Sequence, residues 1–298
     1  MVDLALLQKG VHGSGFPFEL RLATALIKLG YEVRPSLYFL DRDRQKDAEI
    51  DLIATKHFHF SSTSEPEISA TLRVAFECKD TANTFVCFGL PSQRLDDTEN
   101  VSIDVLTPHF RTSRDKKMTG RFNIILFHPR GDESPRIIDH HHYQGAVRYH
   151  SVAIAETHGH GNQQYYRVSS PDTLRHALAK LGSYVGLNDE HEAPDRLMEE
   201  LAHGPSINAL FSALVHPGQH YRYSLSDELP EAASHTSVFL SRSYFGSSLH
   251  YVVDLISAEG LSEAMCRLEA SFSAIVTRVV PYMLQDQSPN DRSRLSLR

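Results

Sequence analysis

The chain has 298 residues, 41% hydrophobic and 22% charged, which is enough apolar material for one large domain or two ordinary ones. Its formal net charge of -7 argues against a protein that coats nucleic acid through bulk positive charge. No apolar run approaches the roughly 20 residues that span a bilayer, and no secretory signal is recognisable. Three cysteines do not make a disulfide framework. We therefore expect a cytoplasmic protein without a membrane partner.

The first expected element is an amphipathic helix over residues 16–29. Ser14 is expected to cap its start, and Gly30 is expected to end it. Apolar residues recur at helical spacing and form a stripe that we expect to be buried, namely Phe16, Leu20, Ala23 and Ile27, widened by Leu22, Leu26 and Leu29.

Three strands are expected next, over residues 31–40, 49–55 and 72–79. A charged turn separates the first two, and a polar loop at 61–69 separates the last two. The order is therefore helix, strand, strand, strand.

The remaining sequence is less regular, and no helix is expected within residues 81–120. Further strands are expected at 122–127, 147–155, 238–243 and 250–257, and further helices at 171–185, 197–215 and 261–284, the last as far as Val280 and Pro281. The fold class is mixed α/β. We divide the chain into a core at 1–130, a C-terminal α/β region at 131–285 that either completes this core or forms a second half, and a disordered tail at 286–298.

Three polar residues interrupt the second and third expected strands. Alternate residues of a strand share a face, so Glu77 and Lys79 lie side by side, about 6–7 Å apart. Asp51 stands between Ile50 and Leu52 in an otherwise apolar strand. If the two strands pair, the three side chains converge. Two neighbouring carboxylates repel each other unless a cation lies between them, and oxygen ligands of this kind suit Mg²⁺.

This pattern resembles the PD-(D/E)xK (restriction endonuclease-like) nuclease superfamily, in its subset of Mrr-like enzymes and Holliday junction resolvases. The resemblance covers roughly residues 13–80, in the helix GFPFELRLATALIKLGYEV with Glu19, the strand EIDLIA with Asp51, and the strand VAFECK with Glu77 and Lys79. It implies a restriction endonuclease-like core at 1–130, in which helices flank a central mixed sheet.

The resemblance also implies roles for individual residues. Asp51 and Glu77 bind Mg²⁺ or Mn²⁺ together with the backbone carbonyl of Cys78. Lys79 orients or activates the attacking water, and Glu19 assists the metal site. We expect these groups to share one pocket.

Two features depart from the family. The spacer between Asp51 and Glu77 is long, which indicates an insertion at 59–71, and the helix expected after the third strand is not obvious in residues 81–93. Nothing recognisable covers residues 130–298.

The expected function is a metal-dependent nucleic-acid phosphodiesterase, foremost a DNA endonuclease of restriction, repair or defence type. Its partner is nucleic acid, with a homodimer left open. One alternative is a catalytically inactive nuclease-like fold that binds nucleic acid or protein. Another is a structural or assembly protein in which the C-terminal half does the work.

Other candidates are weaker. Zinc ligation is conceivable at His140, His141 and His142 and at His158 and His160, but no cysteine or carboxylate has structural-zinc spacing there, and a polar loop is preferred. Two basic patches either contact nucleic acid or are solvated loop charges, namely Arg42, Arg44 and Lys46, and Arg111, Arg114, Lys116 and Lys117.

Overall fold

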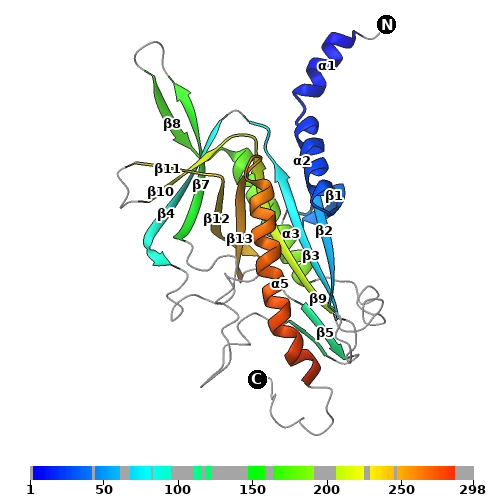
Figure 1. Cartoon of the computed structure of the whole chain (residues 1–298). Helices are drawn as coiled ribbons and strands as arrows, with labels where there is room; N and C mark the ends of the chain where they lie inside the picture. The colour runs from blue at the N-terminus through cyan, green and yellow to red at the C-terminus, as the bar shows by residue number, and fades with distance from the viewer. Residues whose placement is uncertain are drawn as a thin grey trace.

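The described part of the protein is a mixed α/β fold, in which one large mixed sheet is flanked by helices (Figure 1). The expected strand at 122–127, the start of the expected helix at 197–215 and the expected tail lie outside the described residues. The computed structural model describes residues 3–41, 44–60, 68–81, 83–94, 111–115, 118–121, 147–158, 164–190, 206–224, 229–244 and 247–285.

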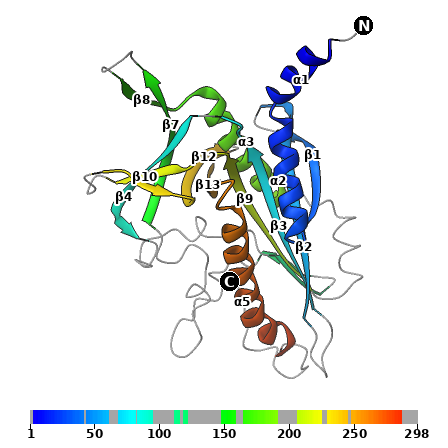
Figure 2. The same cartoon turned by 45° about the horizontal axis from the view of Figure 1, so that its top comes forward.

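Two helices precede the sheet. α2 (Phe16–Lys28) matches the expected helix, whereas α1 (Leu4–His12) is not among the expected elements and continues away from the sheet (Figure 2). Gly15 is the N-cap of α2 with a φ of 83°, a left-handed conformation that glycine adopts readily. The expectation that Ser14 caps α2 is wrong, because the Ser14 hydroxyl donates its hydrogen bond to the carbonyl of Val11 instead.

The apolar stripe of α2 is only partly the buried one. Three side chains are buried in the core, namely Phe18, Leu22 and Leu26. Three others are largely exposed, namely Phe16 (60%), Leu20 (66%) and Ile27 (59%). Because α2 is apolar on both faces, periodicity alone does not select the face that meets the sheet. The expected burial is therefore confirmed for Leu22 and Leu26 and wrong for the three exposed residues.

The three expected strands are confirmed. β1 (Glu32–Asp41), β2 (Lys46–Phe60) and β3 (Ile68–Cys78) form an antiparallel meander. The far edge of β3 pairs in parallel with β9 (Ser206–His216). Strands from both sides of residue 130 therefore belong to the same sheet.

β9 corrects the helix expected at 197–215, at least from residue 206 onward. Its side chains are buried on both faces of the sheet, with Phe211 and Ala213 in one core cluster and Leu210 and Leu214 in the other. A strand buried on both faces is a nearly continuous apolar run, which periodicity cannot distinguish from a buried helix.

The sheet continues beyond β9 with the order β13, β12, β7, β4, β10 and β11. The strands expected at 147–155, 238–243 and 250–257 are confirmed as β7, β12 and β13. The bounds are β4 (Thr84–Arg94), β5 (Arg111–Asp115), β6 (Met118–Arg121), β7 (Val147–His158), β8 (Tyr165–Ser169), β10 (His220–Ser224), β11 (Glu231–Ala233), β12 (His235–Tyr244) and β13 (Ser247–Ser257).

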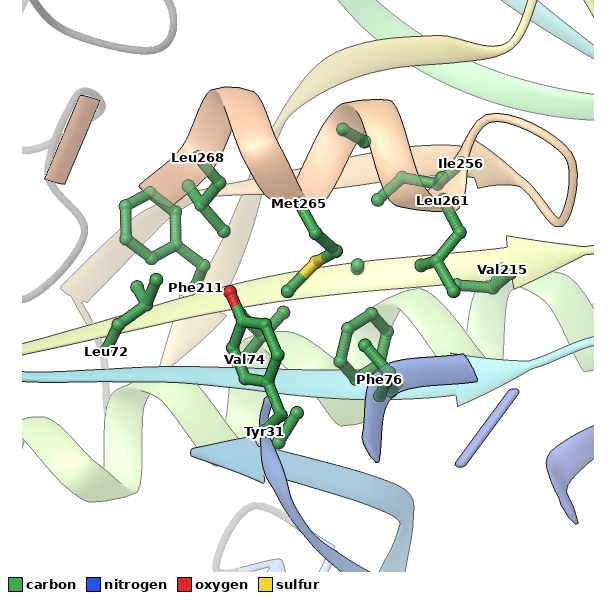
Figure 3. Packing of buried hydrophobic residues seen from close by; sticks show 14 of the residues in the cluster. Tyr31, Leu72, Val74, Phe76, Phe211, Val215, Ile256, Leu261, Met265 and Leu268 are labelled. Carbon is green, nitrogen blue, oxygen red and sulfur yellow. The ribbon is translucent and has the colours of Figure 1, made fainter. Parts of the chain in front are cut away.

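Two further helices were expected and are present, α3 (Asp172–Glu190) and α5 (Leu261–Gln285), and α5 continues through Pro281. α2 and α5 pack on one face of the sheet, where Met265 and Leu268 meet Phe211 and Leu72 (Figure 3). α3 packs on the other face. Among the described residues, no helix has both the length and the apolar character needed to span a membrane.

Candidate functional site

The pairing of β2 with β3 ends beside Asp51. The ladder between β2 and β3 ends with the pair Leu52 and Phe76. One residue beyond this pair, Asp51 Oδ2 accepts a hydrogen bond of 2.7 Å from the backbone N–H of Cys78. β1 is irregular at the same level, where Ser36 has a φ of 55°. Positive φ is strained for a residue with a side chain and is often found at functional sites.

Two carboxylates and two ammonium groups meet at the end of this pairing. The Glu77 side chain is fully buried, with 0% exposure. Lys180 of α3 places its Nζ 2.6 Å from Glu77 Oε1 and 3.6 Å from Asp51 Oδ1. The Nζ of Lys79 lies 3.7 Å from Glu77 Oε2. The structure thus brings Asp51, Glu77 and Lys79 together, as expected if β2 and β3 pair.

Glu77 is held in an unfavourable environment for a negative charge. Burial, followed by the charge of Asp51, raises the pKa of Glu77 to about 7, while Lys180 and Lys79 act in the opposite direction. The ammonium of Lys180, 2.6 Å from Oε1, partly offsets this cost as a charge-assisted ion pair. A carboxylate buried in this way requires neutralisation by a cation or a proton.

Glu19, in the first turn of α2, shares this electrostatic environment. Its pKa is raised, first by partial burial and then by the negative charges of Asp51 and Glu49. Lys180 and Lys79 lower it. The structure therefore places Glu19 within electrostatic reach of Asp51 and of the two lysines.

Cys78 contributes its backbone to the site. Burial, followed by the charges of Asp51, Glu19 and Glu77, raises the pKa of the thiol well above its usual range, which keeps the thiol protonated and unreactive. The N–H and C=O of one strand residue point to the same side. The carbonyl of Cys78 therefore faces the β2 side, where Asp51 binds the N–H.

Lys180 is absent from the sequence-based expectations. It lies in the expected helix α3, on the border of the face that packs against the sheet. Ala177 and Tyr184, three residues before and four residues after it, are buried and share a helix side with position 180. A lysine within this apolar stripe is the local signal that could have identified it.

The oxygen donors of this site suit a magnesium-like ion. Asp51, Glu77 and the carbonyl of Cys78 are hard ligands, and Mg²⁺ retains several waters in such sites. Within the described ranges, no group of three or more His, Cys, Asp or Glu side chains could hold a metal ion. The histidines at 140–142 and 160 lie outside those ranges, and His158 lies beside Glu156 instead.

The basic patches are only partly described. Arg44 forms an ion pair with Asp41 at 3.7 Å, so that it is engaged within its own turn. Arg42, Lys116 and Lys117 lie outside the described residues.

A second polar cluster is buried near the ends of β9 and β13. His216 and His220 share a hydrogen bond of 3.1 Å between Nε2 and Nδ1, and His220 Nε2 lies 2.8 Å from the hydroxyl of Thr236. Burial lowers the pKa of His216 to about 4 and, with the charges of neighbouring basic groups, that of His220 to about 3. We call these three residues the histidine cluster, and no sequence pattern predicts it.

Comparison with known protein families, curated proteins and solved structures gives no match for this chain. Its function must therefore be inferred from the geometry of the site.

Proposed function

We propose that this chain is a metal-dependent nucleic-acid phosphodiesterase, foremost a DNA endonuclease of restriction, repair or defence type. The observation that carries the proposal is the meeting of Asp51 with fully buried Glu77 where the pairing of β2 with β3 ends, with Lys79 and Lys180 against them. A simple ion pair at a strand edge requires neither a second acid nor burial. Paired carboxylates with access to a cation are what metal-assisted phosphodiester hydrolysis requires.

The donor set fits a divalent ion. The nitrogen of Lys180 lies 2.6 Å from Oε1 of Glu77 and 3.6 Å from Oδ1 of Asp51, so that both carboxylates face one positive charge. Glu77 is fully buried, and both its oxygens face ammonium groups, Oε1 that of Lys180 and Oε2 that of Lys79. Asp51 is held in place by the N–H of Cys78 through its other oxygen.

The residues would divide the work as follows. Asp51, Glu77 and the Cys78 carbonyl would hold Mg²⁺ or Mn²⁺. When bound, the ion offsets the negative charge of the phosphodiester and makes water easier to deprotonate. Lys79 holds the attacking water and offsets negative charge that develops on the phosphate. Glu19 accepts hydrogen bonds from water at the rim of the site.

The surrounding fold supports a restriction endonuclease-like core. α2 and the meander β1–β3 have the expected order, and α3 is the first helix after β3 within the described residues. α3 packs against the sheet beside the site. The departure from the family lies in the strands inserted between β3 and α3.

The test is single-turnover cleavage of mixed DNA and RNA substrates with Mg²⁺ or Mn²⁺. Asp51→Ala is expected to abolish cleavage. Asp172→Asn is the matched control, because Asp172 is an exposed carboxylate that pairs with Arg175 on α3. Failure of the wild-type protein to cleave any substrate would remove the phosphodiesterase proposal.

The second candidate is a binding module, that is, a catalytically inactive nuclease-like fold that binds nucleic acid. The ion pair of Lys180 with Glu77 favours it, because the carboxylates already have a cation partner. A protein of this kind binds nucleic acid without cutting it. Salt-sensitive retardation of DNA with no cleavage in any metal would select this alternative.

A further inference from the structure

α3 holds Lys180 in a fixed position above the carboxylates. A Cβ on Gly182 would lie 2.6 Å from the ring of Tyr251, so α3 approaches β13 more closely than any other residue at this position allows. The hydroxyl of Tyr251 donates a hydrogen bond of 3.2 Å to the carbonyl of Leu178. α3 is therefore held against the sheet at Leu178 and at Gly182, two residues before and two residues after Lys180.

The ammonium of Lys180 contacts the oxygens that a metal would need. It lies 2.6 Å from Glu77 Oε1 and 3.6 Å from Asp51 Oδ1. An ion such as Mg²⁺ or Mn²⁺ bound to the same oxygens requires distances of about 2.1 Å. The ammonium and the ion would then be within a few ångströms of each other.

The groups in direct contact are formally balanced without a metal. Asp51 and Glu77 carry two formal negative charges, Lys79 and Lys180 carry two formal positive charges, and Glu19 is a further acid within electrostatic range. Adding a divalent ion leaves an excess of positive charge in a largely buried volume, where repulsion is poorly screened. Moving Lys180 away from the carboxylates relieves that repulsion.

We propose that Lys180 is an internal counter-ion that occupies the metal position in the resting protein and is displaced when a divalent ion binds. The metal affinity of the resting site is therefore set by competition with this lysine. The inference rests on the proposed function, because it assumes that the carboxylate pair binds a metal.

The first test is calorimetric titration of Mn²⁺ into the wild-type protein and Lys180→Gln. Without the competing ammonium, Lys180→Gln binds Mn²⁺ at least about tenfold more tightly. Lys56→Gln is the matched control, because Lys56 is buried to a similar extent and pairs with Glu269 at 2.8 Å on the other face of the sheet. Equal or weaker binding by Lys180→Gln overturns the inference.

The second test uses the wild-type protein, so that it does not depend on the folding of a variant. Lysines are labelled with an acetylating reagent and quantified by peptide mass spectrometry, with and without Mn²⁺. Labelling of Lys180 rises several-fold with Mn²⁺, whereas labelling of Lys56 does not change. Unchanged labelling of Lys180 at saturating Mn²⁺ overturns the displacement.

The two proposals fail in different ways. Cleavage by the wild-type protein combined with unchanged Lys180 labelling overturns the displacement and leaves the phosphodiesterase intact. Tight Mn²⁺ binding by Lys180→Gln without cleavage by the wild type supports the competition and selects the binding module. Absence of Mn²⁺ binding in both proteins overturns both proposals.

Discussion

Two buried polar groups lie on neighbouring strands of one sheet. We call the first the carboxylate site, which consists of Asp51, Glu77, Lys79 and Lys180, and the second is the histidine cluster. Glu77 pairs in register with Leu214, and His216 follows two residues later on the same face of β9. Burial shifts each group toward its neutral form, so that the pKa of Glu77 rises and that of His216 falls.

The two clusters differ in what surrounds the shifted group. The histidine cluster contains neutral rings that hydrogen-bond to each other and to a hydroxyl. The carboxylate site has two lysine ammonium groups within 3.7 Å of Glu77, and its second acid is only partly buried. A shifted pKa therefore marks burial in both places. Of the two, the carboxylate site alone has ammonium groups against the shifted group, which the proposed exchange of Lys180 for a metal ion requires.

The largest effect that we predict is on the cleavage rate, when Lys79 of the carboxylate site is replaced. Lys79→Ala should lower the single-turnover cleavage rate by about 10²- to 10⁴-fold while leaving Mn²⁺ binding intact, because positioning and acid–base roles are worth that much. Lys79→Arg should not restore the rate, since the planar guanidinium presents its donors differently. His220→Gln should cleave normally below its melting temperature. Equal rates for wild type and both lysine variants would assign the activity elsewhere.

The histidine cluster should make the protein less stable in acid. Histidine in the unfolded chain binds a proton near pH 6.5, whereas the pKa of folded His220 is about 3. The unfolded state therefore binds more protons below pH 6.5, and stability falls as the pH drops from about 6.5 to 4, by about 3 kcal/mol for one such histidine. Urea unfolding at several pH values gives the free energy of unfolding as a function of pH, and this free energy should change less with pH in His220→Gln than in the wild type.

An exposed histidine on α3 provides the control for this measurement. His176→Gln should retain the pH dependence of the wild-type protein. An identical pH dependence in His220→Gln would mean that the histidine cluster does not control acid stability.

Glu77 should have the opposite pH dependence. Its carboxyl has a pKa of about 7 when folded and about 4.5 in the unfolded chain, so the folded state binds more protons between these values. Stability is therefore lost as the pH rises from about 4.5 to 7, by about 3 kcal/mol. Because this loss opposes the gain from the histidines, Glu77→Gln should steepen the rise of stability with pH. A profile that matches the wild type would show that Glu77 is already ionised at low pH.

The smallest effect is expected for Asp51→Asn without metal. The asparagine oxygen can still accept the hydrogen bond from Cys78, and one of two repelling charges is lost, so stability should stay within about 1 kcal/mol of wild type or increase. Added Mg²⁺ should raise the melting temperature of the wild-type protein but not of the variant. A fall of many degrees without metal would identify Asp51 as a structural residue.

Local patterns predicted the parts of the site that lie within single strands. The alternation of side chains in β3 placed Glu77 and Lys79 on one face, and the expectation that they meet Asp51 depended on the pairing of β2 with β3, which the structure has. A local pattern could have singled out Lys180 within α3 but not its partners, because these lie far away in sequence and only the packing of α3 brings Lys180 to them. The same limit applies to the histidine cluster, whose members come from three different strands.

The errors in the fold have a related origin. The hydrophobic periodicity of a segment shows which of its faces are apolar. Tertiary packing decides which of these faces another element covers. In α2 both faces are apolar, and the sheet covers the one with Phe18. In β9 both faces are covered, so that the strand has lost the alternation that identifies strands.

The parallel pairing of β3 with β9 also determines when the carboxylate site can form during folding. Cys78 lies beside Val215 in this ladder, so a long stretch of chain must be made and folded before the pairing can close. Such non-local pairing slows folding. During synthesis the two carboxylates leave the ribosome well before Lys180 and β9 do. A nascent chain of about the first hundred residues thus carries Asp51, Glu77 and Lys79 but lacks the helix and strand that hold them in place.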